Sequence, residues 1–230
     1  MPSNPILQVE KLPLFAGQPA ADIQRLLSGA KVTNVRHRKC LYKMGDSAQA
    51  FAVVLQGAFK LVKSTPDGSD TIVFFATPGD VIAGLVMAVP SVYPVSVLAM
   101  GPSVALEIPR QTFLNAWTMN SSIQQSMRDI LFTRMNLMHE QKAMQKAPLA
   151  QKIAREIVGL IERYSGQGET FLPIPITRQE IADSVGASVE SVIRVMSDWS
   201  QNGYMKTTDQ VIHVSRMDKI LEIMMGQIEK

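Results

Sequence analysis

The chain has 230 residues, of which 46% are hydrophobic and 19% charged, and its pI is about 9.0. These values are typical of a globular protein with one large domain or two modest ones. No apolar run approaches the roughly 20 residues of a membrane-spanning helix, and the N-terminus lacks the basic flank and apolar core of a signal peptide. The single cysteine, Cys40, excludes an internal disulfide, so we expect a cytoplasmic protein.

Positive charge is concentrated in the first part of the chain. Residues 1–147 carry 14 Lys/Arg and 9 Asp/Glu, whereas residues 148–230 carry 9 and 11. Any DNA contact made by the C-terminal part therefore depends on a few well-placed cations, because that part has no net positive charge.

Residues 1–120 have the pattern of a β domain. An amphipathic stretch, Ala20–Ser28, predicts a short helix, and strands begin near Val32. Ala50–Lys63 is rich in β-forming residues and has a glycine at 57, and Asp70–Asp80 predicts another strand followed by a turn. Val95–Pro109 predicts two strands around a Gly-Pro turn. Several short strands separated by Gly and Pro are typical of a β-sandwich or barrel.

Residues 121–147 predict one long helix, because they lack Gly and Pro and repeat apolar residues at helical spacing. One row steps by four and three residues, as in a coiled coil, and a second row, Met127, Leu131, Met135 and Met138, lies beside it. Two apolar rows indicate two partners, the β domain and a second copy of the chain; the alternative is a helix buried within a monomer. The residues predicted for the interface of a homodimer are Ile123, Met127, Ile130, Arg134, Leu137, Gln141 and Met144.

Residues 148–230 predict a winged helix-turn-helix. After Pro148 come an amphipathic helix, a loop, the segment ITRQEIADSVGASVESVIRVMSDWSQNG (176–203) and two short strands. Gly186 interrupts the helical pattern where a sharp corner requires a residue that tolerates positive φ. Ser188 follows as the expected N-cap of the second helix. Helix, glycine corner, helix and β-hairpin in this order predict a DNA-binding domain.

The second helix of this pair carries groups suited to recognising bases. An arginine can donate two hydrogen bonds to guanine, and a glutamate can accept one from cytosine N4. The N-terminal end of such a helix enters the major groove. A competing hypothesis is a sensor whose helical tail binds protein, which the acidic balance of residues 148–230 favours. On the DNA-binding hypothesis, the residues that face outward for base contact are Val189, Glu190, Ser191 and Arg194.

The segment ITRQEIADSVGASVESVIRVMSDWSQNGYM closely resembles the DNA-binding signature of the CRP/FNR family of bacterial transcription regulators. The segments YKMGDSAQAFAVVLQGAFKLVK, TPGDVIAG and VALEIPRQTF resemble that family's strand-rich roll, in the same order. The resemblance implies an α+β fold with a cyclic-nucleotide-binding-like jelly roll (1–120), a dimerisation helix (121–147) and a C-terminal winged helix-turn-helix (148–230). It further implies a homodimer that binds a palindromic promoter site and engages RNA polymerase.

The resemblance also implies roles for single residues. Glu190 and Arg194 match the family's base-reading positions. Val189 matches a position that is valine in the FNR branch and arginine in the cyclic-AMP receptor. This match implies a half-site of the TTGA type rather than the TGTGA type. Ile193 departs from the serine common in the FNR branch, so the outer base is unassigned. The residues matched to phosphate contacts are Thr177, Arg178, Gln179 and Ser188.

The family's cyclic-AMP members hold their ligand with a glutamate and an arginine that this chain lacks. The matching segment, Ala83–Val97, has Gly84 and Pro94 at or near those positions, and no Lys or Arg lies between Lys63 and Arg110. A buried phosphate without a cation is costly, so cyclic AMP is disfavoured. We expect an uncharged or apolar effector, or none. The residues predicted to line its pocket are Val81, Ile82, Gly84, Leu85, Val86, Leu137 and Met138.

Other cofactors and enzymatic activity have little support. An iron–sulfur cluster needs four cysteines, and the chain has one. A haem-based or redox gas sensor is the alternative, with His37, Cys40, His139, Pro2 or methionines as candidate ligands. No metal site is predicted. The chain lacks a catalytic triad pattern and a phosphate-binding glycine loop, so we predict that it is not an enzyme.

Overall fold

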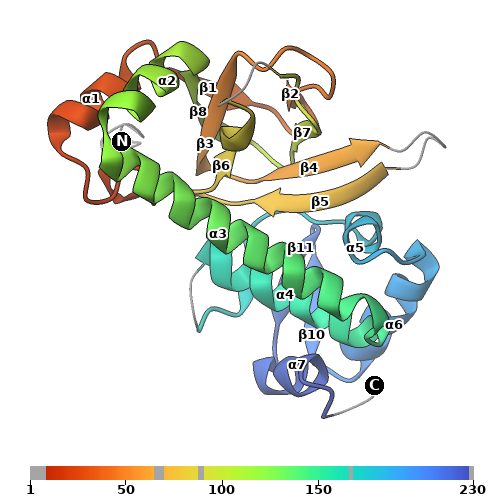
Figure 1. Cartoon of the computed structure of the whole chain (residues 1–230). Helices are drawn as coiled ribbons and strands as arrows, with labels where there is room; N and C mark the ends of the chain where they lie inside the picture. The colour runs from red at the N-terminus through yellow and green to blue at the C-terminus, as the bar shows by residue number, and fades with distance from the viewer. Residues whose placement is uncertain (1–8, 65–69, 88–90, 166–167, 228–230) are drawn as a thin grey trace. The chain divides into compact units, whose positions relative to one another are not determined.

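The computed structural model describes residues 9–64, 70–87, 91–165 and 168–227. Its elements, labelled in Figure 1, fall into two compact units. Residues up to 61 together with 76–140 form the first, here called the β unit, and residues 62–75 together with 141–230 form the second, the helical unit. None of the helices in these ranges is both long and apolar enough to cross a membrane.

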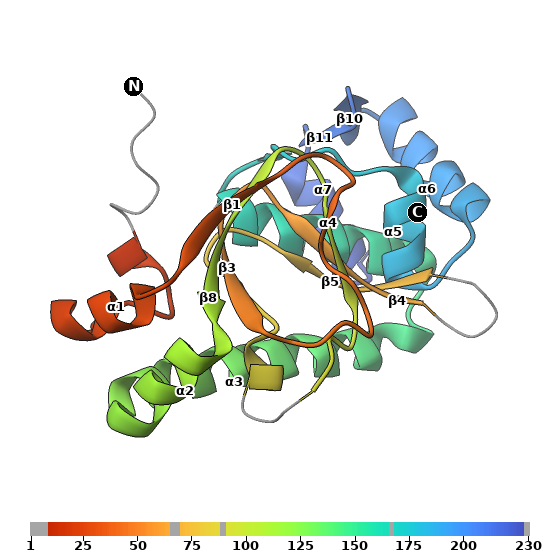
Figure 2. The same ribbon diagram turned by 90° about the horizontal axis from the view of Figure 1, so that it is seen from above.

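Two four-stranded sheets form the roll predicted for the first part of the chain. Figure 2 shows neighbouring strands of the first sheet, which are antiparallel. In spatial order these strands are β1 (Lys31–Val35), β8 (Ser103–Pro109), β3 (Ala50–Gln56) and β6 (Val81–Ile82). The second sheet has the order β2 (Cys40–Tyr42), β7 (Ser96–Ala99), β4 (Phe59–Ser64) and β5 (Asp70–Ala76). β7 and β8 are the two strands predicted for Val95–Pro109, and β5 is the strand predicted for Asp70–Asp80. The β-rich stretch around Gly57 forms β3 and most of β4.

Two helices complete the β unit. The predicted helix is α1 (Ala20–Leu27), which buries Ile23 and Leu26. The other, α2 (Arg110–Met119), was not predicted; it is anchored by Phe113, whose ring lies edge-on to Phe51 of β3 with centroids 5.1 Å apart. Aromatic pairs of this geometry add to the free energy gained from burial alone.

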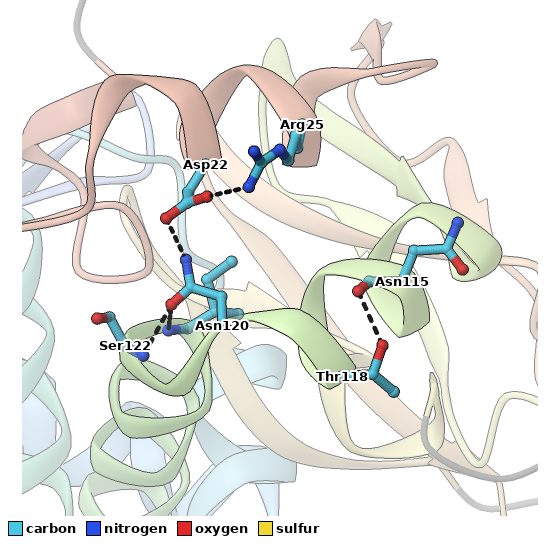
Figure 3. Close-up of polar contacts among 7 residues, drawn as sticks. Asp22, Arg25, Asn115, Thr118, Asn120 and Ser122 are labelled. Carbon is cyan, nitrogen blue, oxygen red and sulfur yellow. Dashed lines mark hydrogen bonds and ion pairs between the residues drawn. The ribbon is translucent and has the colours of Figure 1, made fainter.

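Asn120 joins α2 to the long helix α3 (Ser121–Ala143), and Figure 3 shows its contacts. Its Oδ1 accepts hydrogen bonds from the backbone N–H groups of Ser122 (2.8 Å) and Ile123 (3.3 Å), so it acts as an N-cap. Its Nδ2 donates to Asp22 of α1 (2.5 Å), and Asp22 is also paired with Arg25 (2.7 Å). One side chain therefore fixes the start of α3 against α1.

The end of α3 differs slightly from the prediction. The α-helix ends at Ala143 and continues as a 3-10 turn, Met144–Lys146. Ala147 is extended (φ −69°, ψ 152°), because a residue that precedes a proline is disfavoured in helical conformation. The tighter turn before Pro148 therefore replaces the last turn of the predicted helix.

The helical unit has the predicted order of a winged helix-turn-helix. Its helices are α4 (Leu149–Ser165), α5 (Arg178–Val185), α6 (Val189–Gln201) and α7 (Met217–Met224). Its sheet has the order β10 (Met205–Thr208), β11 (Val211–Val214) and β9 (Phe171–Leu172). The predicted α+β fold is confirmed, whereas β9 and α7 were not predicted.

An arginine accounts for the inclusion of residues 62–75 in the helical unit. Arg163 of α4 donates from Nη1 to the carbonyl oxygen of Phe75 (3.1 Å). Its guanidinium carbon also lies 4.9 Å from the centre of the Phe74 ring, within the range of cation–π attraction. These contacts pair segments almost ninety residues apart, and no local sequence pattern predicts them.

Candidate DNA-binding site

The corner between α5 and α6 has the predicted geometry. Gly186 ends α5 in the left-handed region (φ 66°, ψ 51°), and its N–H donates to the carbonyl oxygen of Ala182. Ser188 then caps α6, since its Oγ accepts a hydrogen bond from the backbone N–H of Ser191 (3.3 Å). The predicted glycine corner and serine cap are both confirmed.

A shared apolar core sets the crossing of the two helices. Ile181 and Ala182 of α5 and Val192 of α6 are fully buried. Met196 and Trp199 of α6 are also fully buried and extend this core along α6. Met196 lies four residues after Val192, and Trp199 lies three residues after Met196; this helical spacing is the sequence signal that identifies them. Buried area of this kind contributes about 25 cal/mol per Å² to folding.

The opposite face of α6 is exposed and carries the predicted base-contacting pair. Glu190 and Arg194 are both exposed, and residues four apart lie on the same face of a helix. They form no ion pair with each other or elsewhere in the ranges that the structure covers. Val189 and Ser191 are half-buried beside them. The charged groups of Glu190 and Arg194 are therefore available to base edges.

The first turn of α5 holds three of the residues matched to phosphate contacts. Thr177 is the N-cap: its Oγ1 accepts from the N–H of Glu180 (3.1 Å), and Glu180 Oε2 accepts from the N–H of Thr177 (2.8 Å). This capping box holds the first turn of the helix. Gln179 is exposed and donates to Asp183 (2.7 Å).

Arg178 makes a contact within the chain that the sequence pattern did not indicate. It is half-buried, and its Nη2 donates to Thr207 Oγ1 of β10 (2.8 Å). Burial lowers the pKa of its guanidinium. In this structure Arg178 therefore links α5 to β10, because the strand supplies an acceptor that the sequence pattern did not indicate.

The wing is a tight hairpin of β10 and β11. Asp209 and Gln210 form its two-residue turn with φ values of 51° and 65°. Two consecutive positive φ values are typical of a type I′ turn, whose twist matches that of paired strands. The predicted pair of short strands around a polar turn is confirmed.

Few cations in the helical unit are available for phosphate. Arg216 and Lys219 are engaged in ion pairs at α7 (2.7 and 2.6 Å). Arg194 and Lys206, on α6 and β10, are exposed and form no ion pair within the described ranges. Their positions on α6 and the wing match the requirement for a few well-placed charges.

Two family models match the chain in the order of its two parts. The cyclic nucleotide-binding domain matches residues 32–120, and the Crp-like helix-turn-helix domain matches residues 151–223. The transcriptional activator protein anr of Pseudomonas aeruginosa is 25% identical over 195 residues, which are 82% of this chain and 78% of that protein. The chain belongs to the CRP/FNR family.

Further relatives agree with this CRP/FNR assignment. The nitrogen fixation regulation protein FixK of Bradyrhizobium diazoefficiens is 26% identical over 162 residues, 69% of this chain and 67% of that protein. The solved structure of FixK2 from Bradyrhizobium japonicum has a TM-score of 0.75 at 18% identity, and the match covers 84% of this chain and 96% of that one. The CRP/FNR chain described here is a DNA-binding transcription regulator and not an enzyme.

The β unit of this CRP/FNR chain contains a cavity of about 110 Å³. Of the residues predicted to line a pocket, Val81, Ile82, Gly84 and Val86 lie on its wall, while the side chain of Leu85 is outside what the structure describes. The other lining residues are Leu61, Ala83, Tyr93, Pro94, Val95, Val97, Ile130, Leu131 and Arg134.

Leu137 and Met138, which were predicted for the pocket, do not line it. Met138 is 57% exposed, and α3 instead contributes Ile130, Leu131 and Arg134 to the wall. An α-helix rises 1.5 Å per residue, so a shift of seven residues is about 10 Å along its axis. That part of the prediction is wrong, because the cavity lies against an earlier part of α3.

The predicted dimer row on α3 is only partly available to a second subunit. Ile123 and Met127 are each 1% exposed and are buried inside the β unit, so their assignment to a dimer interface is wrong. The other five members of the row, Ile130, Arg134, Leu137, Gln141 and Met144, are at least partly exposed.

A different apolar row on α3 is open to solvent. Phe132, Met135 and Met138 recur every three residues and are 60%, 47% and 57% exposed. Met135 and Met138 belong to the second apolar row that the sequence indicated, whereas Phe132 was missed. Its spacing of three residues from Met135 is the signal that could have revealed it.

The candidate haem ligands are dispersed. His37 is exposed, and its Nδ1 lies 2.9 Å from the carbonyl oxygen of Met100. Cys40 donates from Sγ to the carbonyl oxygen of Tyr42 (2.8 Å), and partial burial raises its pKa. His139 is exposed on α3, and Pro2 lies outside the described residues. Within those residues, no three His, Cys, Asp or Glu side chains are grouped to hold a metal ion.

Proposed function

We propose that this regulator is a cytoplasmic homodimer that binds a palindromic promoter site through α6 and is not controlled by a cyclic nucleotide. The observation that carries the proposal is the exposed pair Glu190 and Arg194, one helical turn apart, directly after the capped corner at Gly186 and Ser188. A helix presented in this way fits the major groove with its N-terminal end foremost.

The bases contacted follow from this chemistry and from Val189. Arg194 can donate two hydrogen bonds to a guanine edge, and Glu190 can accept one from a cytosine amino group. Val189 lies at the first position of α6, where the cyclic-AMP receptor has arginine, so no second guanine is contacted from this position. We therefore propose a half-site of the TTGA type rather than the TGTGA type. By family resemblance, RNA polymerase is the proposed protein partner.

The exposed row on α3 supports the dimer. Three large apolar side chains at helical spacing are costly to leave in water, and an isologous contact between two copies of α3 would cover them. Such a dimer would bind two half-sites about one helical turn of DNA apart.

The cavity supports control by something other than a cyclic nucleotide. At Gly84, where cyclic-AMP members have glutamate, an added Cβ would lie 2.8 Å from Cγ1 of Val81 and 3.2 Å from Sδ of Met127. No side chain fits there without displacing its neighbours. The volume of about 110 Å³ is also below the several hundred Å³ of typical drug-sized sites.

Fluorescence anisotropy with a labelled TTGA palindrome and a matched TGTGA palindrome tests the proposal. We expect the parent to prefer TTGA, and Arg194→Ala to lose about 1–3 kcal/mol per half-site, or roughly 5- to 150-fold. Val189→Arg is expected to shift the preference toward TGTGA, because an arginine there can contact the additional guanine.

Two variants serve as controls. Ser197→Ala changes an exposed residue on the same helix one turn later, and Arg128→Ala removes an exposed arginine from α3. Neither is expected to change affinity by more than about twofold. If Arg194→Ala binds DNA as the parent does, or if salt has no effect on binding, the helical tail does not act through DNA and a protein partner becomes the better hypothesis.

A further inference from the structure

A cleft lies where α1 and α2 meet the start of α3 in the β unit, and we call it the α1–α2 cleft. Its volume is about 290 Å³, close to the lower end of the range for small-molecule sites. The cavity described above, lined by β6 and the middle of α3, is smaller, at about 110 Å³. None of the residues that line the α1–α2 cleft belongs to the DNA-binding surface of α6 and the wing.

An ion pair forms part of the wall of the α1–α2 cleft. Arg25 Nη1 donates to Asp22 Oδ1 at 2.7 Å, and Figure 3 shows both side chains on α1. The side chain of Arg25 is 62% exposed and that of Asp22 is 18% exposed, so both charged groups are accessible to a ligand. These are the two charged side chains among the described lining residues, and their charges sum to zero.

Both partners of this ion pair keep hydrogen-bonding capacity. Arg25 has five N–H donors and, within the described ranges, pairs with Asp22 alone, so most of its donors are open. Asp22 accepts from Arg25 and from Asn120 Nδ2 (2.5 Å), but a carboxylate has about four acceptor positions. A ligand carboxylate can therefore be added to Arg25, and a ligand ammonium group to Asp22, without breaking the pair.

Neutral side chains of the wall add further hydrogen-bonding groups. Asn115 of α2, labelled in Figure 3, accepts from Gln111 through Oδ1 (2.9 Å), while its Nδ2 donates to no other described residue. The hydroxyl of Ser28 also has no hydrogen-bond partner in the part of the chain that the structure describes. An amide N–H₂ donates, and a hydroxyl donates or accepts. The cleft therefore offers neutral groups beside the two charges.

The rest of the wall is apolar. Ala116 and Ile123 are 7% and 1% exposed and form the part of the wall that is most buried. Met119, the last residue of α2, is 75% exposed. Methionine is flexible and polarisable and adapts to apolar groups of different shapes. An apolar group of a ligand can therefore pack against Ala116 and Ile123 and be covered by Met119.

Charge and size together define the ligand class. A ligand with only a carboxylate would be repelled by Asp22, and a ligand with only an ammonium group would be repelled by Arg25. A zwitterion, which carries both groups close together, is attracted by both partners. A protein cavity of about 150 Å³ holds benzene, so a cleft of about 290 Å³ has room for an α-amino acid with an aliphatic side chain.

We propose that the α1–α2 cleft binds a free α-amino acid with an apolar side chain. Arg25 pairs with its carboxylate, Asp22 pairs with its ammonium group, and Met119 covers its side chain. The inference goes beyond the proposed function, because it adds a ligand site that is separate from the DNA-binding surface and from the smaller cavity. Since Asn120 bonds to Asp22 and caps α3, the ligand is held at the first turn of that helix.

Isothermal titration calorimetry on the full-length protein without DNA tests the site. The probes are L-leucine and L-valine, each compared with its amide, which keeps only the ammonium group, and with its deaminated acid (4-methylpentanoate or 3-methylbutanoate), which keeps only the carboxylate. At pH 7 we expect at least one amino acid to bind, and its amide and deaminated acid to bind at least about fivefold more weakly. Failure of both amino acids to bind, or equally tight binding of the amide or the deaminated acid, overturns the proposal.

Substitutions that remove one charge assign each half of the ligand. Arg25→Gln should weaken amino-acid binding at least about fivefold and abolish the preference over the amide, because it removes the partner of the carboxylate. Asp22→Asn keeps an acceptor for Asn120 and should abolish the preference over the deaminated acid. The matched control, Arg128→Gln, changes an exposed arginine of α3 outside the cleft and should bind every probe as the parent does.

A preference for the amino acid over its amide that persists in Arg25→Gln overturns the assignment of Arg25. If a variant does not fold, as judged by its melting curve, the comparison of the three kinds of probe on the parent decides the question. Anisotropy with the TTGA palindrome and no added amino acid reports DNA binding separately, so failure of the ligand site and failure of the proposed function give different results.

Discussion

Replacing Gly186 with alanine isolates the backbone requirement of the helix-turn-helix corner. Gly186 has φ 66° and ψ 51°, and a Cβ built on it meets no other atom within 4 Å. The added methyl group therefore causes no clash, and its cost is that of placing an L-residue in the left-handed region, about 1–2 kcal/mol. Gly186→Asn is expected to cost less, because asparagine enters this region more readily.

Urea unfolding followed by the fluorescence of Trp199 measures this cost. Trp199 is fully buried in the helical unit, and a Trp117→Phe background leaves it as the only tryptophan of the two in the chain. Gly159→Ala is the matched control: Gly159 lies inside α4, a Cβ there also meets nothing within 4 Å, and we expect a gain of about 0.5–1 kcal/mol. If Gly186→Ala is as stable as its parent while Gly159→Ala gains stability, the left-handed corner is refuted.

Three further predictions follow from single side chains. Burial raises the pKa of Glu156 above its ordinary value of 4.5, so the folded chain binds this proton more tightly than the unfolded chain, and stability is lost as pH rises from 4.5 through the folded-state pKa. Thermal melts should therefore show Glu156→Gln to be more stable than the parent at pH 7, with the difference disappearing below about pH 4; a constant difference would contradict this. Phe132→Glu places a charge in the exposed row of α3 and should shift the native mass from dimer to monomer, whereas an unchanged dimer would show that this row is not the interface. Ile193, 46% exposed between Glu190 and Arg194, can contact a thymine methyl group, so replacing half-site thymines with deoxyuridine should weaken binding by the parent but not by Ile193→Ser.

The corner between α5 and α6 could be predicted from the sequence because the residues that set its backbone conformation are local. A left-handed residue at Gly186 and a hydroxyl at Ser188 act within five residues of the corner, and their effects do not depend on the rest of the chain. The exposed positions of Glu190 and Arg194 follow from helical periodicity once Val192 is assigned to the core. The same holds for the strands, whose alternation is visible over a few residues.

Predictions that required a partner segment were less successful. Both apolar rows of α3 were visible in the sequence, but periodicity does not state which row packs inside the β unit, and Ile123 and Met127 were assigned to the wrong partner. The same ambiguity moved the predicted pocket along α3, from Ile130 and Leu131 to Leu137 and Met138, about two turns later. The hydrogen bond from Arg178 to Thr207 is likewise a contact between segments that the sequence pattern did not indicate, while the phosphate contact matched to Arg178 stays a prediction.

The sequence by itself determined the order of most elements, the corner and the exposed face of α6, since these depend on backbone conformation and on side-chain spacing within one helix. Only the tertiary structure decided which face of α3 is buried, where the cavity lies and that Arg134 is its sole charge among the described lining residues. These features arise where segments far apart in sequence pack together, as Phe51 does with Phe113. The free energy of such packing depends on the shapes of the two surfaces that meet, and no single stretch of sequence contains both surfaces.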